Sequence, residues 1–489
     1  MASTRATSTM ALYLTTHPFS QELARPMDAA ITMHVAAAPA DLDTFARALR
    51  GRLVRPGDDD FAAVSGVWNL DRQGTPLAIV QASDAGDVAT AIGFARRNDI
   101  EIAVRSGGHS LAGHSTGDGV LVIDARGMRG LHVDLGRGIA WAGAGLTAGE
   151  VTSALAEHGM AVPFGDTATV GIAGLTLGGG IGWLARKYGL AIDSLLAVEI
   201  VTPDGEVRMA SETEHPDLFW ALRGGGGNFG VVTRFCYRLS PVGAIYGGAL
   251  FLPATRDALR SLVPIASSAP EELTVIAALM PAPPAPFIPE EHHRKPSLAV
   301  MFVFVGDAEA GSAAIAPFRA VATPYGEMVA AMPYPGIYEL TKEAGEPAAS
   351  TTRSVFMDVL DDASVDAILA AYATGPEGTM IQIRAFGGAM GRVPVDATAF
   401  PHRSATAQVT IISHIGDPAM TDAAVAWNRG LFEVLRPMSS GVYVNFLEDE
   451  GEERVRDAYP HGAHERLALV KRRYDPKNVF HRNQNIRPA

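Results

Sequence analysis

Short apolar segments alternate with amphipathic ones between about residues 71 and 243. PLAIVQAS (76–83) has the composition of a strand, and DAGDVATAIGFARRNDI (84–100) places apolar residues at helical spacing. EIAVRSGG (101–108) then predicts a second strand that runs into glycines. This alternation is typical of an α/β arrangement.

The middle of the chain, about 244–435, has a different pattern. Strand-like runs at 297–306, 379–388 and 407–415 lie between helical ones, which predicts an antiparallel sheet with helices and a Pro-rich loop at 281–296. The last 50 residues predict a strand, GVYVNFL (441–447), and then a long polar helix that stops before Pro476. We expect residues 1–38 to form a poorly ordered extension.

Composition narrows the function classes. The chain has 489 residues, enough for about three domains or two large ones. Lys+Arg 40 against Asp+Glu 53 gives a net charge of −13, which argues against a nucleic-acid or anionic-membrane partner. No apolar run reaches the length of a membrane helix, and the N-terminus is a poor secretory signal, so we expect a cytoplasmic protein. A single cysteine, Cys236, excludes an intramolecular disulfide, and no metal site is expected.

Three generic motifs match the sequence, each in an unsuitable context. Gly143–Ala148 fits a dinucleotide fingerprint with a capping box at Thr147 and Glu150, but some 70 residues of α/β pattern precede it. Gly225–Gly230 fits the same fingerprint but leads into a predicted strand. Gly113–Gly117 fits a nucleophile elbow around Ser115, again followed by a strand. A serine hydrolase using Ser115 and a non-catalytic nucleotide-binding module therefore stay open as alternatives.

Glycine-dense turns recur at 105–110, 141–145, 171–182 and 223–230. Glycine allows backbone N–H groups to approach a ligand closely and to surround an anion. Four such turns within about 130 residues indicate either one extended, phosphate-bearing ligand or ordinary hairpin and helix-cap glycines.

Separated segments resemble one family in sequence order, over about residues 45–489. They are V-R-S-G-G-H-S (104–110), D-x-x-T-V-G-I-A-G-L-T-L-G-G-G-I-G (166–182), R-K-Y-G-L-A-I-D (186–193), D-L-F-W-A-L-R-G-G-G-G-N-F-G (217–230), R-V-P-V-D-A-T-A-F-P-H-R (392–403), Y-V-N-F (443–446) and Y-D-P-K-N-V-F-H-R-N-Q-N-I (474–486). The chain resembles the FAD-linked oxidases of the vanillyl-alcohol-oxidase fold, in the berberine-bridge-enzyme-like group that includes 6-hydroxy-D-nicotine oxidase.

The resemblance implies an α+β fold with two parts. We expect a two-subdomain PCMH-type FAD-binding domain at 39–243 and an antiparallel-sheet substrate domain with helices at 244–435. A C-terminal berberine-bridge-like segment, 436–489, is expected to return to the FAD domain.

The resemblance also assigns cofactor residues. It implies that His109 carries FAD through the flavin 8α-methyl carbon and that Arg105 helps to neutralise phosphate. Relatives often attach the flavin a second time through a cysteine, but Thr167 occupies that position here, so we expect one covalent link and a packed Cys236. The further expected cofactor contacts are Ser106, Gly107, Gly108, Ser110, Gly145, Asp166, Thr167, Thr169, Gly171, Gly174, Gly179, Asn228, Val231, Asn445, Asn483 and Asn485.

By the same resemblance Tyr443 is the expected catalytic base, with Asn445 beside it on one face of a strand. A phenol needs a neighbouring positive charge or flavin contact to act as a base at neutral pH. The implied reaction removes hydride from a C–H next to OH or NH of a small molecule and reduces O2 to H2O2, so an oxidase is favoured over a dehydrogenase. Expected substrates are an alkaloid amine, a sugar or a secondary-metabolite alcohol.

Substrate selection is expected within 244–435, with Phe356, Met357, Arg384 and His402 as pocket residues. Relatives admit or block oxygen at a position that aligns with Thr176. The sequence does not indicate the oligomeric state.

Overall fold

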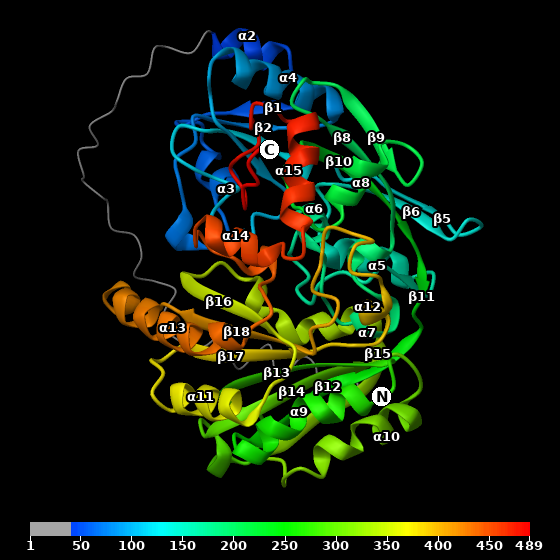
Figure 1. Cartoon of the computed structure of the whole chain (residues 1–489), viewed down its shortest axis with the longest axis vertical. Helices are drawn as coiled ribbons and strands as arrows, with labels where there is room; N and C mark the ends of the chain where they lie inside the picture. The colour runs from blue at the N-terminus through cyan, green and yellow to red at the C-terminus, as the bar shows by residue number, and fades with distance from the viewer. Residues whose placement is uncertain (1–40) are drawn as a thin grey trace.

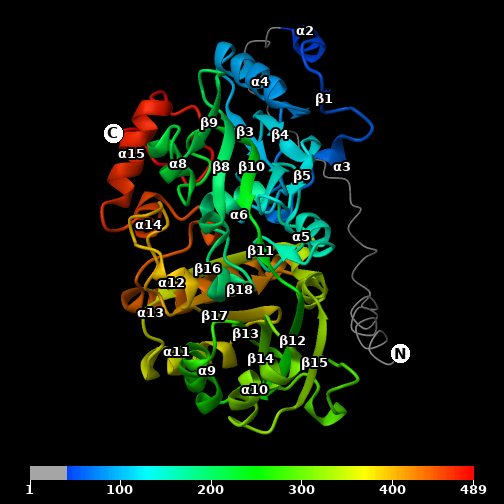
Figure 2. The same ribbon diagram turned by 90° about the vertical axis from the view of Figure 1, so that its right-hand side faces the viewer.

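The computed structural model describes residues 41–489, which form two lobes (Figures 1 and 2). The upper lobe in both views holds a four-stranded and a five-stranded sheet together with a two-stranded pair, and the lower lobe holds one seven-stranded sheet. The expected N-terminal extension, 1–38, lies outside the described residues.

A four-stranded sheet in the order β1-β2-β4-β3 begins the upper lobe. Strands β2, β4 and β3 are parallel, and β1 pairs antiparallel with β2. The connection from β2 to β3 is helix α4 (Ala85–Arg97), whose N-terminus is capped by the Asp84 carboxylate. The strand–helix–strand prediction for 76–108 is confirmed. The strands are β1 (Arg52–Val54), β2 (Ala78–Gln81), β3 (Ile102–Arg105) and β4 (Leu121–Asp124).

The second sheet of this lobe is antiparallel throughout, in the order β5-β6-β10-β8-β9. Helix α5 (Ala148–Ala156) begins with the predicted capping box of Thr147 and Glu150. Because strand β6 before it has only antiparallel neighbours, Gly143–Ala148 does not open a Rossmann unit. The strands are β5 (Leu131–Asp134), β6 (Ile139–Gly143), β8 (Leu195–Val201), β9 (Val207–Ser211) and β10 (Val231–Arg238).

Cys236 is buried on β10 as a packed residue, as expected. Short elements complete the upper lobe. They are α2 (Leu42–Arg47), α3 (Phe61–Ser65), α6 (Ile172–Gly178), α7 (Ala185–Tyr188), α8 (Pro216–Leu222) and the two-stranded pair β7 (Met160–Ala161) and β11 (Ser240–Pro241). The 3-10 turns of the whole described chain are η2 (Leu70–Arg72), η3 (Ala125–Gly127), η4 (Ala191–Asp193), η5 (Glu290–His292), η6 (Tyr334–Thr341), η7 (Glu343–Gly345), η8 (Pro418–Met420), η9 (Arg436–Met438) and η10 (Val444–Phe446).

The lower lobe is a seven-stranded antiparallel sheet in the order β15-β12-β14-β13-β17-β18-β16. This confirms the predicted antiparallel sheet with helices, and the Pro-rich loop connects β13 to β14 as expected. The strands are β12 (Ala244–Pro253), β13 (Leu273–Pro281), β14 (Pro296–Phe304), β15 (Gly326–Pro333), β16 (Ser350–Met357), β17 (Thr379–Ala385) and β18 (Ala407–His414).

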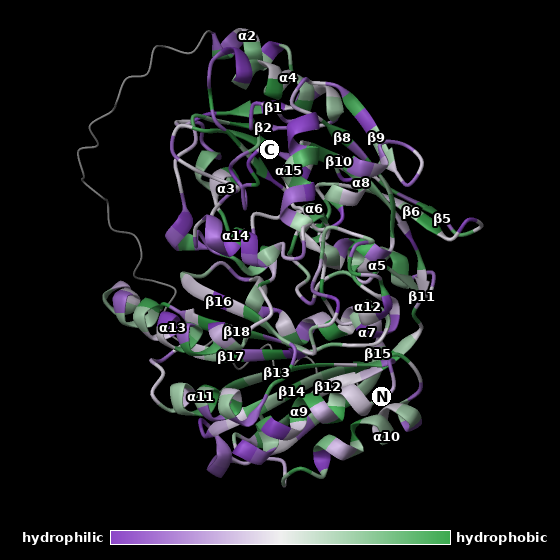
Figure 3. Ribbon diagram, viewed as in Figure 1, coloured by the Kyte–Doolittle hydropathy of each residue, from purple (hydrophilic) through white to green (hydrophobic). Residues whose placement is uncertain are grey.

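Four helices cover the face of this sheet that points away from the upper lobe (Figure 1). Alternate residues of these strands point to that face, and most of them are apolar and pack against the helices. Figure 3 shows polar and apolar residues interspersed along these helices, as expected when one side packs on a sheet. The helices are α9 (Arg256–Ser268), α10 (Ala308–Arg319), α11 (Asp362–Ala373) and α13 (Thr421–Leu435), and the short α12 (Ala389–Arg392) lies on the other side near α7.

The predicted strand GVYVNFL is wrong. Only Gly441 makes a β-bridge, to Phe356, and the chain then turns through η10 with Phe446 N–H donating to the Tyr443 carbonyl. The side chain of Asn445 donates to the Leu175 carbonyl on α6. Contacts with the upper lobe therefore replace the strand pairing that the apolar pattern predicted.

The C-terminal segment returns to the upper lobe through α14 (Glu452–Ala458) and α15 (Ala463–Tyr474), which packs against α8 (Figure 1). The predicted long helix is thus two helices, and the second ends before Pro476 as predicted. Lys471 on α15 is fully buried, and its ammonium donates to the carbonyls of Asn228 and Phe480 and to Asp475 at 2.6–2.7 Å. This ammonium joins the helix to a glycine-rich turn and to the tail.

Lys471→Met should destabilise the fold by about 3–5 kcal/mol, because it leaves the buried Asp475 carboxylate unpaired. Urea unfolding followed by circular dichroism measures the change. The exposed Lys477→Met is the matched control and should change the free energy of unfolding by less than about 0.5 kcal/mol. Equal midpoints for the two variants would contradict the assigned role of Lys471.

Candidate functional site

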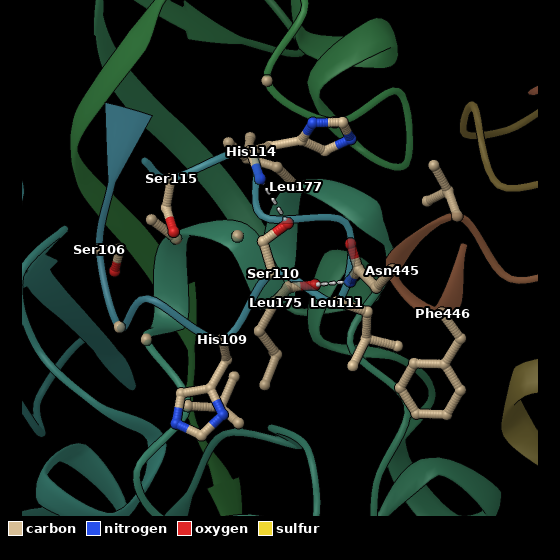
Figure 4. A pocket seen from close by; sticks show the side chains of 18 of the residues that line it. Ser106, His109, Ser110, Leu111, His114, Ser115, Leu175, Leu177, Asn445 and Phe446 are labelled. Carbon is tan, nitrogen blue, oxygen red and sulfur yellow. Dashed lines mark hydrogen bonds between the residues drawn. The ribbon is translucent and has the colours of Figure 1, made fainter. Parts of the chain in front are cut away.

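A cavity of about 420 Å³ lies between the two lobes. The upper lobe contributes the loop after β3, the turn leading into α6 and the glycines before β10. The lower lobe contributes the face of β16, β17 and β18 that carries no helices, and the C-terminal segment contributes η10 and the tail. Figure 4 shows how the loop after β3 and helix α6 present their side chains to this space.

Most of the residues expected at the cofactor site line this cavity. Four expected residues do not line it, namely Gly145, Thr169, Gly179 and Asn485. Those that do are Arg105, Ser106, Gly107, Gly108, His109, Ser110, Asp166, Thr167, Gly171, Gly174, Asn228, Val231, Tyr443, Asn445 and Asn483.

His109 extends from the loop after β3 into the cavity (Figure 4). Its ring stacks on Trp68 with the centroids 5.7 Å apart and the planes inclined by 24°. Burial lowers the pKa of His109 to about 4, because the cationic imidazolium is poorly solvated there. At neutral pH the imidazole is therefore uncharged and has a free nitrogen lone pair.

Arg105 has a structural role that its sequence position did not reveal. Its guanidinium donates to the carbonyls of Val64, at 2.7 Å, and Gly66. Burial lowers the pKa of Arg105 to about 10. Two of its three nitrogens thus hold a neighbouring loop, while Nε is buried without a partner among the described residues and Arg105 lines the cavity. Its expected role toward phosphate stays a prediction.

The loops at Gly107 and Gly171 approach each other too closely for a side chain. A Cβ at Gly107 would lie 2.2 Å from the Gly171 nitrogen, and one at Gly171 would lie 2.2 Å from the Gly107 nitrogen. The Ser106 hydroxyl donates to the Ala144 carbonyl at 2.7 Å and adds the third glycine-rich turn to this contact. Three of the four predicted turns thus meet at one wall of the cavity.

The four expected residues outside the cavity wall have other neighbours. A Cβ at Gly145 would lie 2.2 Å from the Ala125 carbonyl oxygen, so that glycine allows close packing. Gly179 adopts φ 142° beside the ring of Tyr443. Thr169 donates to the Gly345 carbonyl at 3.4 Å, and the side-chain oxygen Oδ1 of Asn485 is buried without a partner among the described residues.

Tyr443 has a buried hydroxyl group with two N–H donors on its oxygen. The Gly180 backbone N–H donates at 2.9 Å and the Asn445 side-chain amide at 3.0 Å. Burial raises the pKa of Tyr443, while these donors and the positive charge of Arg384 lower it. The neighbours that a phenolic base needs are therefore present, although Tyr443 and Asn445 meet on a turn and not on a strand.

Arg384 is the one expected pocket residue of the lower lobe that lines the cavity. Its guanidinium binds the Asp166 carboxylate at 2.7 Å. Phe356 and His402 stack on each other behind Tyr443, with ring centroids 4.6 Å apart. Met357 points the other way, into the core under the helices, because alternate residues of β16 face opposite sides. The expectation for Met357 is therefore wrong.

Thr176 does not reach the cavity either. It is fully buried in α6, and its hydroxyl pairs with the Tyr237 hydroxyl at 2.8 Å. Helical geometry turns Thr176 toward β10, whereas Ala173, Gly174, Leu175 and Leu177 of the same helix line the cavity. The expected oxygen-access role of Thr176 is corrected on this ground.

Unpaired buried polar atoms on the cavity wall fit a large polar ligand. They include His114 Nε2, Ser115 Oγ and Asn483 Oδ1, and buried polar atoms normally have a hydrogen-bond partner. The turns at Gly107–Gly108 and Gly225–Gly227 add backbone to the same wall with no side chains in the way. The residues present therefore fit an extended cofactor such as FAD.

The nucleophile elbow at Ser115 is not formed. No helix follows Ser115, and its hydroxyl has no hydrogen-bond partner in residues 41–489, so it has no adjacent base. A hydrolase using Ser115 lacks the geometry it needs.

Several cavity residues lie outside the sequence prediction. Arg482 and Gln484 lie in the tail segment that carried the resemblance, so that segment was a usable signal for them. His114 lies inside the Gly113–Gly117 motif, which predicted no cofactor contact for it. No local motif marked the others, which reach the cavity only through the fold: Trp68, Thr352, Gln382 and Thr410.

Residues 41–489 contain no cluster of three or more His, Cys, Asp or Glu side chains suited to a metal ion. No helix in this part of the chain is both long and apolar enough to cross a membrane.

Comparisons with known proteins agree with this site. A family model described as an FAD binding domain matches residues 76–211, and one described as berberine and berberine like matches residues 442–487. The chain is 30% identical over 462 residues to (R)-6-hydroxynicotine oxidase of Paenarthrobacter nicotinovorans, covering 90% of this chain and 97% of that protein. It is 32% identical over 465 residues to an uncharacterised FAD-linked oxidoreductase of Bacillus subtilis, covering 90% of this chain and 97% of that protein.

Solved structures show the same fold. A crystal structure of 6-hydroxy-D-nicotine oxidase from Arthrobacter nicotinovorans superposes with a TM-score of 0.82 at 28% identity, covering 90% of this chain and 98% of that one. Xylooligosaccharide oxidase from Myceliophthora thermophila gives a TM-score of 0.81 at 23% identity, covering 91% of this chain and 99% of that one.

Fold, cavity and comparisons together define the class: the protein is an FAD-dependent oxidoreductase. Within that class the chain belongs to the berberine-bridge-enzyme-like family of FAD-linked oxidoreductases, as the sequence motifs predicted. A non-catalytic nucleotide-binding module is no longer an alternative.

Gly107→Ala should reduce the bound flavin, because the added Cβ collides with the Gly171 backbone and forces the two loops apart. The expected loss of stability is about 1–3 kcal/mol. The flavin-to-protein absorbance ratio and the melting temperature measure both effects. Gly130→Ala, where an added Cβ has nothing within 4 Å, is the control and should keep both values. Full flavin content in Gly107→Ala would refute this account of the loop contact.

Proposed function

We propose that the protein is an oxidase whose FAD is bonded covalently to His109 alone and whose catalytic base is Tyr443. The observation that carries the proposal is that an uncharged, desolvated imidazole and a phenol with two N–H donors line the same cavity.

The environment of His109 supports covalent attachment. An attacking imidazole must keep its lone pair, and the lowered pKa ensures this over the physiological range. Trp68 stacks on the ring and restricts its rotation. Thr167 lines the cavity where relatives with two links have a cysteine, and Cys236, the only cysteine of the chain, does not line it. One link is therefore the number that this chain supports.

The environment of Tyr443 supports proton acceptance from a substrate. The Gly180 and Asn445 N–H groups occupy lone-pair positions of the phenolic oxygen and stabilise negative charge on it once the proton has left. Phe356 and Phe400 pack against the ring and hold its orientation. The hydroxyl is thus fixed at the cavity wall before a substrate arrives.

Bound FAD supplies the hydride acceptor: the substrate C–H loses two electrons as hydride, its OH or NH loses a proton, and O2 takes up both to become H2O2. Oxygen as the acceptor is supported by relatives that are named oxidases, which include the hydroxynicotine oxidase and the xylooligosaccharide oxidase. Mixing anaerobically photoreduced enzyme with aerated buffer tests it without a substrate. Rapid return of the oxidised flavin spectrum supports an oxidase, and persistence of the reduced spectrum for minutes favours a dehydrogenase.

His109→Ala should abolish covalent retention of the flavin. Acid-precipitated wild type should stay yellow and show the mass of the chain plus one FAD, whereas the variant should release all colour and show the bare chain mass. His114→Ala is the matched control, since its imidazole lines the same cavity and is also held uncharged, with a pKa of about 4. Retention of colour by His109→Ala, or its loss from His114→Ala alone, would show that the attachment is elsewhere.

Tyr443→Phe should slow flavin reduction by substrate about 10²–10⁴-fold while the covalent flavin stays in place. A substrate is first identified by anaerobic bleaching of the flavin with alkaloid amines, sugars and alcohols. Stopped-flow measurement against pH then follows the reduction rate, which should rise in wild type as Tyr443 loses its proton. The variant should lack this rise, and an unchanged pH profile would exclude Tyr443 as the base.

A further inference from the structure

The cavity wall contains only one carboxylate, Asp166, among its residues in the described chain. Asp166 lies in the upper lobe, in the turn that leads to α6, and Arg384 reaches it from β17 of the lower lobe. The atoms Oδ2 and Nη2 are 2.7 Å apart, and the side chains are only 13% and 6% exposed. The one negative charge at the wall is therefore already neutralised within the protein.

His414 is the other basic residue that the lower lobe contributes to the wall, and burial lowers its pKa and so favours its neutral form. The basic residues of the upper lobe and the tail have hydrogen-bond partners within the protein or are uncharged. Arg105 donates to two backbone carbonyls, and Arg482 donates to the Thr116 carbonyl and lies 3.4 Å from Glu101. His109 and His114 are held in their neutral forms by burial. At the lower-lobe wall, neither an ammonium nor a carboxylate group entering the cavity meets a free counter-charge.

Neutral hydrogen-bonding groups surround the ion pair on the lower lobe. Gln408 lies opposite Arg384 in the strand register, and Thr410 lies opposite Gln382. The Thr410 hydroxyl, the Arg384 Nε and both amide atoms of Gln408 are buried without a partner in the described part of the chain. Thr352 and Gln382 extend the same polar face along the cavity wall.

We propose that the Asp166–Arg384 ion pair makes the cavity select an uncharged substrate bearing hydroxyl or carbonyl groups, and exclude its ammonium and carboxylate analogues. The proposal rests on the proposed function, because it concerns the substrate of that same site. Among the expected substrates, the proposal favours a sugar or an alcohol over an amine that is cationic at neutral pH.

The physical basis is desolvation. A charged group that leaves water for a buried site needs a counter-charge, whereas a hydroxyl needs only a donor or an acceptor. The lower-lobe wall offers several such donors and acceptors but no free charge. Removing one member of the pair leaves the charge of the other without a partner. Each single substitution should therefore change, in a defined direction, which substrate charge the cavity prefers.

The test uses two series of probes with matched shapes and different charges. They are D-glucose, D-glucosamine and D-glucuronate, and benzyl alcohol, benzylamine and benzoate. Binding to the flavin-loaded protein at pH 7 is followed as a perturbation of the flavin absorbance. We expect a neutral member to bind about tenfold or more tightly than the charged members of its series.

Arg384→Met leaves Asp166 unpaired and should tighten binding of the amine probe, relative to the neutral probe, by at least about tenfold. Asp166→Asn leaves Arg384 unpaired and should tighten binding of the carboxylate probe, relative to the neutral probe, by a similar factor. The double variant Asp166→Asn/Arg384→Gln removes both charges and should restore the preference for the neutral probe. It also serves as the control for folding, because it leaves no buried charge without a partner.

Tighter binding of a charged probe by wild type, or no binding of either neutral probe up to its solubility limit, would overturn the proposal. Single variants that weaken all probes equally would also overturn it, since the pair would then only hold the lobes together. If a single variant fails to fold, the double variant decides: loss of the neutral preference there overturns the proposal. A colourless wild-type protein would instead refute the proposed function, so the two failures are distinguishable.

Discussion

The backbones of two loops meet at Gly107 and Gly171, with no space for a side chain between them. The cavity depends on this contact because it places the loop carrying His109 against the turn that leads to α6. Ser106 extends the contact to the Ala144 carbonyl at the end of the central antiparallel sheet. Glycine is required at this contact by the space available, since neither residue has a positive φ.

The same close packing sets the electrostatics of the site. Exclusion of water keeps His109 and His114 uncharged and raises the pKa of Tyr443, while nearby N–H donors and Arg384 oppose that rise. Burial also strengthens the pairing of Arg384 with Asp166. The uncharged imidazoles, the raised pKa of the phenol and the buried ion pair thus follow from one cause, the desolvation of a cavity between two lobes.

The C-terminal segment completes the cavity wall. It brings Tyr443 and Asn445 against α6, and the tail returns beside the glycines that precede β10. The Lys471 ammonium holds this arrangement by binding the Asn228 and Phe480 carbonyls together with Asp475. Residues more than 240 positions apart in the chain therefore act as one wall, and the cavity forms only when both lobes and this segment have folded.

The sequence by itself determined the local elements and the family. Periodicity placed α4 and its strands, the capping box placed α5, and the ordered glycine motifs identified the FAD-linked relatives, because each of these depends on neighbouring residues or on motif order. Only the tertiary structure decided which way side chains point between elements. Tyr443 lies on a turn held by α6, Met357 and Thr176 face away from the cavity, Arg105 binds loop carbonyls, and Arg384 crosses between lobes to Asp166. These outcomes depend on sheet register and on contacts between distant residues, and no local pattern in the sequence carries that information.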